Sequence, residues 1–236
     1  MISRVAVVPH PPLLVPELSP GCAADLRTAC LTAVSRLGKA WLAVGAHDDD
    51  LSIEPESAGT FRGYGVDVPV SLSTERVPSG ELPLPALVAG WLRERAGAAS
   101  VRIRLVPRAT PAAECERIGK ELADSPETSL LILADGSNRH GPRSPGSEDA
   151  RAPAFDESVA EALRNADVPG LLALDVRLAE ELGAGGRAPW QVLAGLGPGW
   201  RAELLYSDAP FGVGYHVAVW ERASRPSGDP VDGQRR

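Results

Sequence analysis

The chain has 236 residues, which is long enough to bury the core of one α/β domain. Its formal net charge of −7 argues against nucleic acid or an anionic membrane as the main partner, because both bind clustered Lys and Arg. No apolar run reaches the roughly 20 residues that span a bilayer, and no basic segment precedes an apolar core at the N-terminus. We therefore expect a cytoplasmic protein whose partner is a neutral or aromatic small molecule or another protein.

The three cysteines, Cys22, Cys30 and Cys115, are odd in number and lack the C-x2-C spacing of a zinc site. They predict neither a disulfide framework nor structural zinc, and we expect all three to be small buried hydrophobic residues. The basic residues are almost all arginines, with Lys39 and Lys120 as the lysines, which is typical of a GC-rich bacterial genome.

Strand-like and helix-like segments alternate along the first half of the chain. Residues 3–8 are largely apolar and β-branched and are bounded by Pro9, which predicts a buried strand. Ala, Leu and Val then recur at helical spacing up to Gly38, which predicts a helix over 23–37. The next segments are predicted, in chain order, as a strand at 41–44, a helix at 84–97, a strand at 101–106 and a helix at 110–124.

The second half of the chain begins with a strand predicted at 129–134. Residues 136–154 are polar and rich in Gly and Pro, which predicts a long loop after this strand. We expect this loop to be a mobile flap, because it has few apolar anchors to offset the entropy of ordering it. The remaining segments are predicted as helices over 155–167 and 175–186, one late strand with a Gly-rich kink over 206–220, and a disordered tail over 222–236.

The four earlier strands are apolar along both faces, which is what a sheet covered by helices on two sides requires. A strand, helix and strand in succession begin a parallel sheet. The predicted fold class is therefore α/β, a single domain over residues 1–221 with a central, mostly parallel or mixed sheet flanked by helices.

Three of the four histidines, His10, His47 and His140, stand at or just past the end of a predicted strand. The carboxyl ends of the strands in an open parallel α/β sheet converge on one edge, where ligands bind. The prolines on both sides of His10 restrict the backbone, so its ring would be held in one direction, as suits a metal ligand. Each of the three could also be an ordinary surface or hydrogen-bonded loop histidine, and His216, inside the late strand, is expected to be structural.

Four segments of the chain carry a resemblance to a known family. They are VAVVPHPPLLVPEL, VGAHDD, LILADGSNRHGPRSPG with FDESVAEAL after it, and DAPFGVGYHVA. Together they resemble the class III extradiol ring-cleavage dioxygenases, whose wider superfamily includes the Memo-like proteins. The resemblance covers residues 2–220 and implies a sandwich-like α/β domain, a mononuclear non-haem iron(II) site, a catecholic substrate and O2.

The resemblance also implies a metal site made of two histidines and one carboxylate. His10 matches the first metal histidine of the family, and His47 falls where the second is expected. The third ligand has no clean match, since Asp208 and Glu203 both stand near its place. We choose Asp208, because the turn before Pro210 could aim a short carboxylate at the strand edge. Two neutral imidazoles and one carboxylate leave open positions and suit iron(II) oxygen chemistry.

Two hypotheses about function remain open at this point. In the first, iron(II) held by His10, His47 and Asp208 opens a catecholic ring with O2, and His140 moves protons, because the pKa of histidine lies close to neutral. Another divalent metal, or none, is also compatible with the sequence. In the second, a degenerate family member binds a small molecule or a protein partner without turnover. A homo-oligomer and a complex with a second type of subunit are both compatible with either hypothesis.

Overall fold

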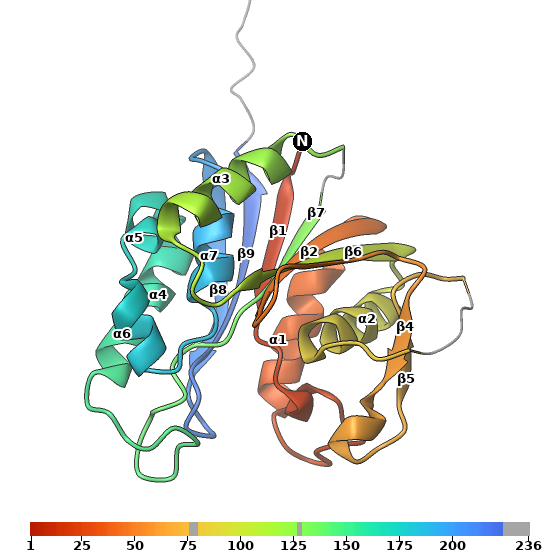
Figure 1. Ribbon diagram of the computed structural model, residues 1–236, viewed down its shortest axis with the longest axis horizontal. Coiled ribbons are helices and arrows are strands. Elements are labelled where there is room, and N and C mark those ends of the chain that lie inside the picture. Colours follow the sequence, from red (N-terminus) through yellow and green to blue (C-terminus); the bar gives the residue numbers. More distant parts are fainter. Residues whose placement is uncertain (76–79, 127–128, 224–236) are drawn as a thin grey trace, which may run out of the picture.

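The computed structural model describes residues 1–75, 80–126 and 129–223 (Figure 1). Within these residues, seven strands form one mixed sheet: β1 (Arg4–Val8), β2 (Ala40–His47), β3 (Leu51–Ile53), β6 (Ser100–Pro107), β7 (Ser129–Leu133), β8 (Trp200–Asp208) and β9 (Tyr215–Arg222). The strand order is β3-β6-β2-β7-β1-β9-β8. Strands β6, β2, β7 and β1 run parallel, whereas β3, β9 and β8 are antiparallel to their neighbours. The strands β4 (Ala58–Thr60) and β5 (Pro69–Ser71) form a small second sheet.

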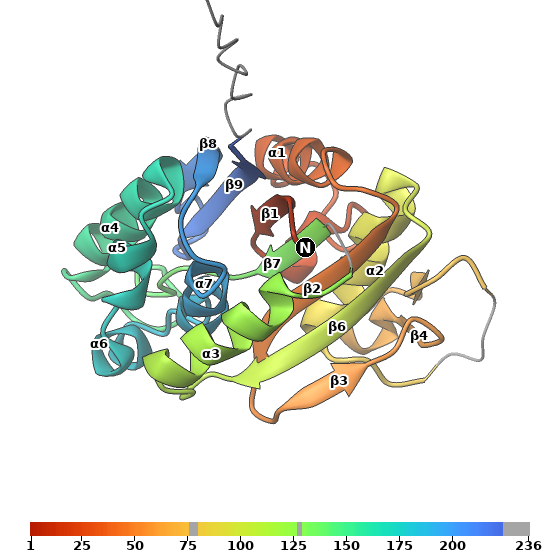
Figure 2. The same cartoon turned by 90° about the horizontal axis from the view of Figure 1, so that it is seen from above.

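Helices cover both faces of the large sheet (Figure 2). One face carries α1 (Ala24–Ser35) and α2 (Leu84–Ala96). The other face carries α3 (Ala112–Ala123), α4 (Ala152–Asn165), α5 (Val168–Leu172), α6 (Val176–Glu181) and α7 (Arg187–Ala194). Two short 3-10 helices, η1 (Pro12–Leu14) and η2 (Phe61–Tyr64), lie in the connections.

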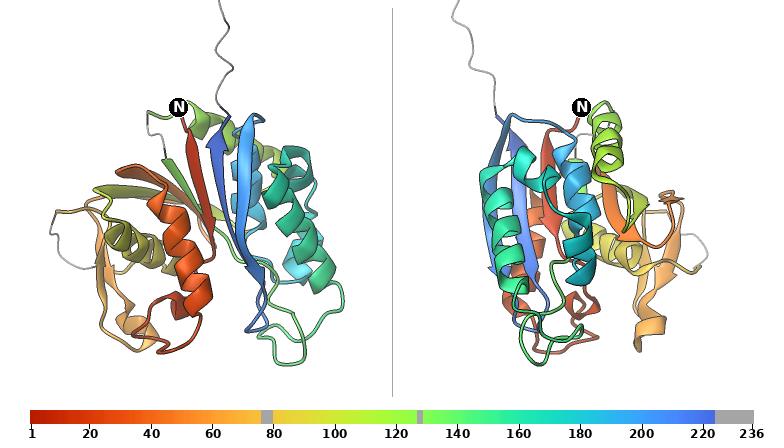
Figure 3. Two further views of the ribbon diagram at one scale, coloured as in Figure 1. Left: turned by 180° about the vertical axis from the view of Figure 1, so that it is seen from behind. Right: turned by 60° about the vertical axis from the view of Figure 1, so that its left-hand side comes forward.

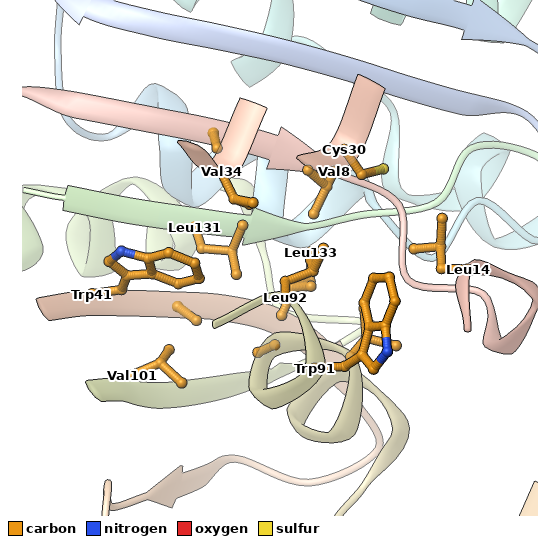
Figure 4. Close-up of a cluster of buried hydrophobic side chains, with 14 of the residues drawn as sticks. Val8, Leu14, Cys30, Val34, Trp41, Trp91, Leu92, Val101, Leu131 and Leu133 are labelled. Carbon is orange, nitrogen blue, oxygen red and sulfur yellow. The ribbon is translucent and has the colours of Figure 1, made fainter. Parts of the chain in front are cut away.

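The central strands are buried on both faces of the sheet. In β1, Ala6 and Val8 belong to the hydrophobic cluster under α1 and α2, whereas Val5 and Val7 belong to the cluster under α3 to α7. Figure 4 shows part of the first cluster, in which Trp41 packs among aliphatic side chains. Full burial of one large apolar side chain contributes about 1.5–3 kcal/mol, so these two clusters are the main source of stability.

The structure confirms the α/β fold class and the four strands predicted from their apolar patterns. They are β1, β2, β6 and β7, and the observed limits differ from the predicted ones by one to three residues. The predicted helices correspond to α1, α2, α3, α4 and α6. Helix α4 begins at Ala152, three residues before the predicted start, so the predicted loop is shorter than expected.

The single late strand predicted over 206–220 is wrong. These residues contain the end of β8, a turn and most of β9, which pair antiparallel with Ser207 opposite His216. Within the turn, Pro210 cannot donate a ladder hydrogen bond, and Gly212 has a φ of +75°, which favours glycine. The prolines and glycines that we interpreted as a kink therefore reverse the chain and form a hairpin.

The prediction that all three cysteines are buried is wrong for Cys22, whose side chain is exposed. Cys22 lies in the turn before α1, where no helix face directs it toward the sheet. Cys30 and Cys115 are buried on α1 and α3, and burial raises the pKa of both thiols. None of the three thiols forms a disulfide bond within the described residues.

The end of the described chain differs slightly from the predicted boundary of the tail. Strand β9 continues to Arg222, and residues 224–236, most of the predicted tail, lie outside the described residues. Across the described ranges, every helix is too short or too polar to cross a membrane.

The order of connections creates a crevice at the carboxyl edge of the sheet. After β1 the chain passes to α1 on one face, and after the neighbouring strand β7 it passes to α4 on the other face. Adjacent strands whose connections leave to opposite faces form a topological switch point, where ligands bind in open α/β sheets. Figure 3 shows the loop after β7 lying beside the turn between β8 and β9 at this edge. The candidate site is built here.

Candidate functional site

A buried carboxylate, Asp156 in the first turns of α4, lies at the centre of the candidate site. Its side chain is 6% exposed, and His140 Nε2 lies 2.5 Å from its Oδ2. The backbone N–H of Ser137 donates to both carboxylate oxygens, at 3.1 Å each. Burying an ionised carboxylate is costly unless donors surround it, so these contacts fix the loop after β7 against α4.

Two glycines allow the backbone to approach Asp156 closely. A Cβ atom built on Gly136 would lie 2.4 Å from Asp156 Oδ1, and one built on Gly214 would lie 1.9 Å from Oδ2. Any side chain at either position would therefore displace the carboxylate. The two residues also pair through the backbone, because Gly136 N donates to Gly214 O at 2.7 Å.

Backbone hydrogen bonds anchor the predicted flap to the start of β9. Gly214 N donates to Ser137 O at 2.8 Å, and His140 N donates to Gly212 O at 3.1 Å. The loop therefore pairs with the hairpin at the end that carries His140. Composition alone indicated a loosely held segment, because it does not reveal backbone pairing with a distant part of the chain. Movement of the loop on ligand binding stays a prediction.

A second histidine, His216 on β9, also faces Asp156. Its Nε2 lies 3.5 Å from Asp156 Oδ1, and its Nδ1 lies 3.0 Å from Ser207 Oγ on β8. The ring is buried and packs at a tilt against Trp190, with 6.0 Å between the ring centres. His216 is a buried residue of the sheet, as expected, but no sequence pattern indicated that it belongs to the polar cluster.

A cavity of about 250 Å³ opens beside this cluster. Its polar lining consists of His140, Asp156, Glu157, Ser207, Asp208 and His216. A second hollow adjoins it, since His140 also lines a space bordered by Pro142, Pro210 and Phe211. His140 therefore stands between a polar cavity and a surface with an exposed aromatic ring, which is the composition of many small-molecule sites.

His10 lies at the switch point, directly after β1, beside the residue that follows β7 on the neighbouring strand. Its backbone N–H donates to Asp135 Oδ1 at 2.9 Å, and its ring Nδ1 lies 3.4 Å from Asp135 Oδ2. This Nδ1 atom is buried and has no hydrogen-bond partner among the described residues. Burial and the charge of Asp135 raise the pKa of Tyr215 on the same side of the sheet.

The other two predicted metal ligands lie away from His10. His47 ends β2 and accepts a hydrogen bond from Asp49 N at 3.1 Å. Asp208 ends β8, where its Oδ1 accepts from Ala209 N at 2.7 Å, and it lines the cavity beside His140.

The strand order keeps the predicted ligands apart. Between His47 on β2 and Asp208 on β8 stand β7, β1 and β9, and four strand spacings amount to about 19 Å. Ligands of one metal ion lie about 2 Å from it, so the structure does not bring the predicted set of His10, His47 and Asp208 to one point. In the described ranges, no group of three or more His, Cys, Asp or Glu side chains could hold a metal ion. The iron(II) site stays a prediction without a gathered ligand set.

Two acidic residues of the site were missed from the sequence. Asp135 follows a predicted strand directly, which is the same signal that singled out His10 and could have identified it. Asp156 stands at the start of a predicted helix, sixteen residues after His140, and local patterning gives no sign that the two meet.

Comparisons with known proteins support the fold and leave the site unassigned. No model of a known protein family matches the chain, and no curated protein matches it. Among solved structures, the chain is similar to the uncharacterized protein JW3007 from Escherichia coli K12, with a TM-score of 0.56 and 14% sequence identity. The match covers 93% of this chain and 99% of that chain. At this identity the likeness shows a shared fold alone.

We predict that Gly214→Ala damages the site through the contact with Asp156. Its Cβ would stand 1.9 Å from the carboxylate, so the free energy of unfolding should fall by about 1–3 kcal/mol. The matched control is Gly63→Ala, because a Cβ at Gly63 meets no atom within 4 Å and its effect should stay within about 0.5 kcal/mol. Urea unfolding of both variants measures the difference. Equal stability of the two variants would contradict the described packing around Asp156.

Proposed function

We propose that the chain binds a small hydroxyl-bearing aromatic molecule beside His140, and that the pair of His140 and Asp156 moves a proton at that molecule. The observation that carries this proposal is the 2.5 Å contact between His140 Nε2 and Asp156 Oδ2 at the wall of a cavity. A histidine oriented by a buried carboxylate is a recurrent arrangement for general acid–base chemistry.

The surroundings of Asp156 determine which nitrogen of His140 can exchange a proton with a ligand. Ser137 N donates to the carboxylate, so Asp156 acts as an acceptor, and His140 Nε2–H is the matching donor. The neutral ring then keeps its lone pair on Nδ1, for which the described residues provide no hydrogen-bond partner. His140 Nδ1 is therefore the base that would take a proton from a bound hydroxyl group.

The lining of the two spaces beside His140 supports the substrate class. Glu157 and Asp208 add carboxylate acceptors to the polar cavity, which favours a ligand with hydroxyl donors over an anionic one. Phe211, which is 40% exposed, borders the adjoining hollow and offers a surface for an aromatic ring. A catechol combines both features, and the sequence resemblance to ring-cleavage dioxygenases favours the same class.

Of the two hypotheses about function, the geometry favours binding without iron-dependent ring cleavage. The reason is the placement of His10, His47 and Asp208, which lie on separate strands and do not gather. Ring cleavage with O2 and iron(II) is the second candidate. One observation favours it, since His10 holds a buried, unpartnered Nδ1 atom at the switch point of the sheet.

The setting of the proposed activity follows from composition. The net charge of −7 favours a cytoplasmic protein that binds neither nucleic acid nor membranes. A homo-oligomer or a complex with a second type of subunit is compatible with the proposal.

We predict that bound 4-nitrocatechol loses a proton to His140. Its absorbance should shift to that of the catecholate at a pH about one unit below the ionisation of the free probe, because a neighbouring base favours the charged form. In His140→Gln the shift should disappear, and the affinity should fall about tenfold through loss of one hydrogen bond to a charged group. The control is His47→Gln, which changes a histidine outside the cavity and should keep both affinity and shift.

The same titration can contradict the proposal in two ways. An absorbance shift of equal size in His140→Gln and the unmodified protein would show that another group takes the proton. Absence of saturable binding by any of the three proteins would remove the aromatic ligand itself.

A separate prediction tests the second candidate. Protein purified anaerobically with added iron(II) should retain well below one equivalent of iron, because the predicted ligands are not gathered around one point. The variants His10→Ala and His47→Ala should leave the iron content unchanged, as measured by elemental analysis. One equivalent of iron in the unmodified protein, lost in both variants, would establish the iron centre and overturn the preference stated above.

A further inference from the structure

A separate cavity of about 270 Å³ opens on the face of the sheet covered by α3 to α7. It lies between the turn after β6, which carries Arg108, and the glycine-containing turn before α7. Its charged lining residues are Arg108, Glu180 and Arg187, and it shares no lining residue with the cavity beside His140.

Arg187, the first residue of α7, is a buried cation. It is 2% exposed, and its guanidinium donates to the backbone oxygens of Arg108 and Thr110 and, at 2.9 Å, to Gln191 Oε1. All of these partners are neutral. No carboxylate in the described part of the chain lies within ion-pair distance of it, although the two other buried residues with charged side chains at the sheet edge, Asp156 and His10, each face a group of opposite character.

A buried guanidinium without a counter-ion is costly, because desolvation is not offset by an opposite charge. Burial accordingly lowers the pKa of Arg187. An anion bound in the cavity would supply the missing charge. Arginine is well suited to this task, since its planar group binds carboxylate and phosphate oxygens in pairs.

Arg108 adds a second cation to the same cavity. A Cβ built on Gly185 would lie 3.1 Å from Arg108 Nη1, so this guanidinium packs against the turn before α7. Its Nε lies 3.3 Å from the exposed Asp48, a contact of the kind that contributes little in water. Glu180 is exposed and is the carboxylate that lines the cavity. The amino end of the eight-residue helix α7 adds positive partial charge.

We propose that this cavity is a binding site for a small oxyanion, a carboxylate or phosphate group, held by Arg187 and Arg108. Arg187 provides the buried charge, and the exposed Arg108 contacts the anion from the solvent side. Glu180 opposes the anion and limits its affinity. This site is independent of the proton transfer proposed for His140.

Calorimetric titrations with inorganic phosphate and with acetate, at constant ionic strength in chloride, test the proposal and distinguish the two oxyanions. Saturable binding of one anion per chain is expected for at least one of them. Arg108→Gln should weaken it about tenfold or more, as expected for loss of a charged hydrogen bond, and Glu180→Gln should tighten it severalfold. The control Arg201→Gln makes the same change of charge on β8, outside the cavity, and should leave the affinity unchanged.

Two results would overturn the proposal. One is the absence of saturable binding of both anions, and the other is equal affinity of Arg108→Gln and Arg201→Gln. Arg187→Gln is informative where it folds, because unchanged affinity in a folded variant would also exclude the site. If Arg187→Gln does not fold, the opposite effects of Arg108→Gln and Glu180→Gln decide the question.

Discussion

The candidate site depends on one buried carboxylate, Asp156. Donors and rings from three parts of the chain meet it: the loop after β7 supplies Ser137 and His140, β9 supplies His216, and α4 carries the carboxylate itself. Because an ionised carboxylate without these partners would cost several kcal/mol, the loop, the hairpin and the helix must be in place together. Gly136 and Gly214 are part of the same constraint, since only glycine leaves room for the oxygens.

The loop after β7 also connects this site with the second cavity. Its first residue, Asp135, accepts from Gly186 N at 2.7 Å, and Ser137 Oγ donates to Leu182 O at 2.8 Å. The turn before α7 therefore supports the loop from the side opposite the β8–β9 hairpin. One stretch of backbone thus stands between a cavity rich in carboxylates and histidines and another that carries two arginines. The two cavities favour ligands of different charge.

The parts of the fold that were predicted correctly are those determined by local patterning. Strands β1, β2, β6 and β7 are apolar on both faces, and that pattern is visible in a few consecutive residues. The β8–β9 hairpin was missed because its glycines and proline are equally compatible with a kinked strand. Asp208 was assigned by counting along a motif, whereas its position depends on strand order. The contact between His140 and Asp156 depends on loop pairing with β9, which no local pattern reveals.

The central claim is that Asp156 orients His140 through Nε2 and leaves Nδ1 as the base. Nitrogen-15 NMR of the histidine rings tests it directly, at a pH where the rings are neutral. We predict that His140 carries its proton on Nε2, and that Asp156→Asn shifts both of its ring nitrogen resonances while those of His47 stay unchanged. A proton on Nδ1 of His140, or identical His140 resonances in the two proteins, would contradict the account.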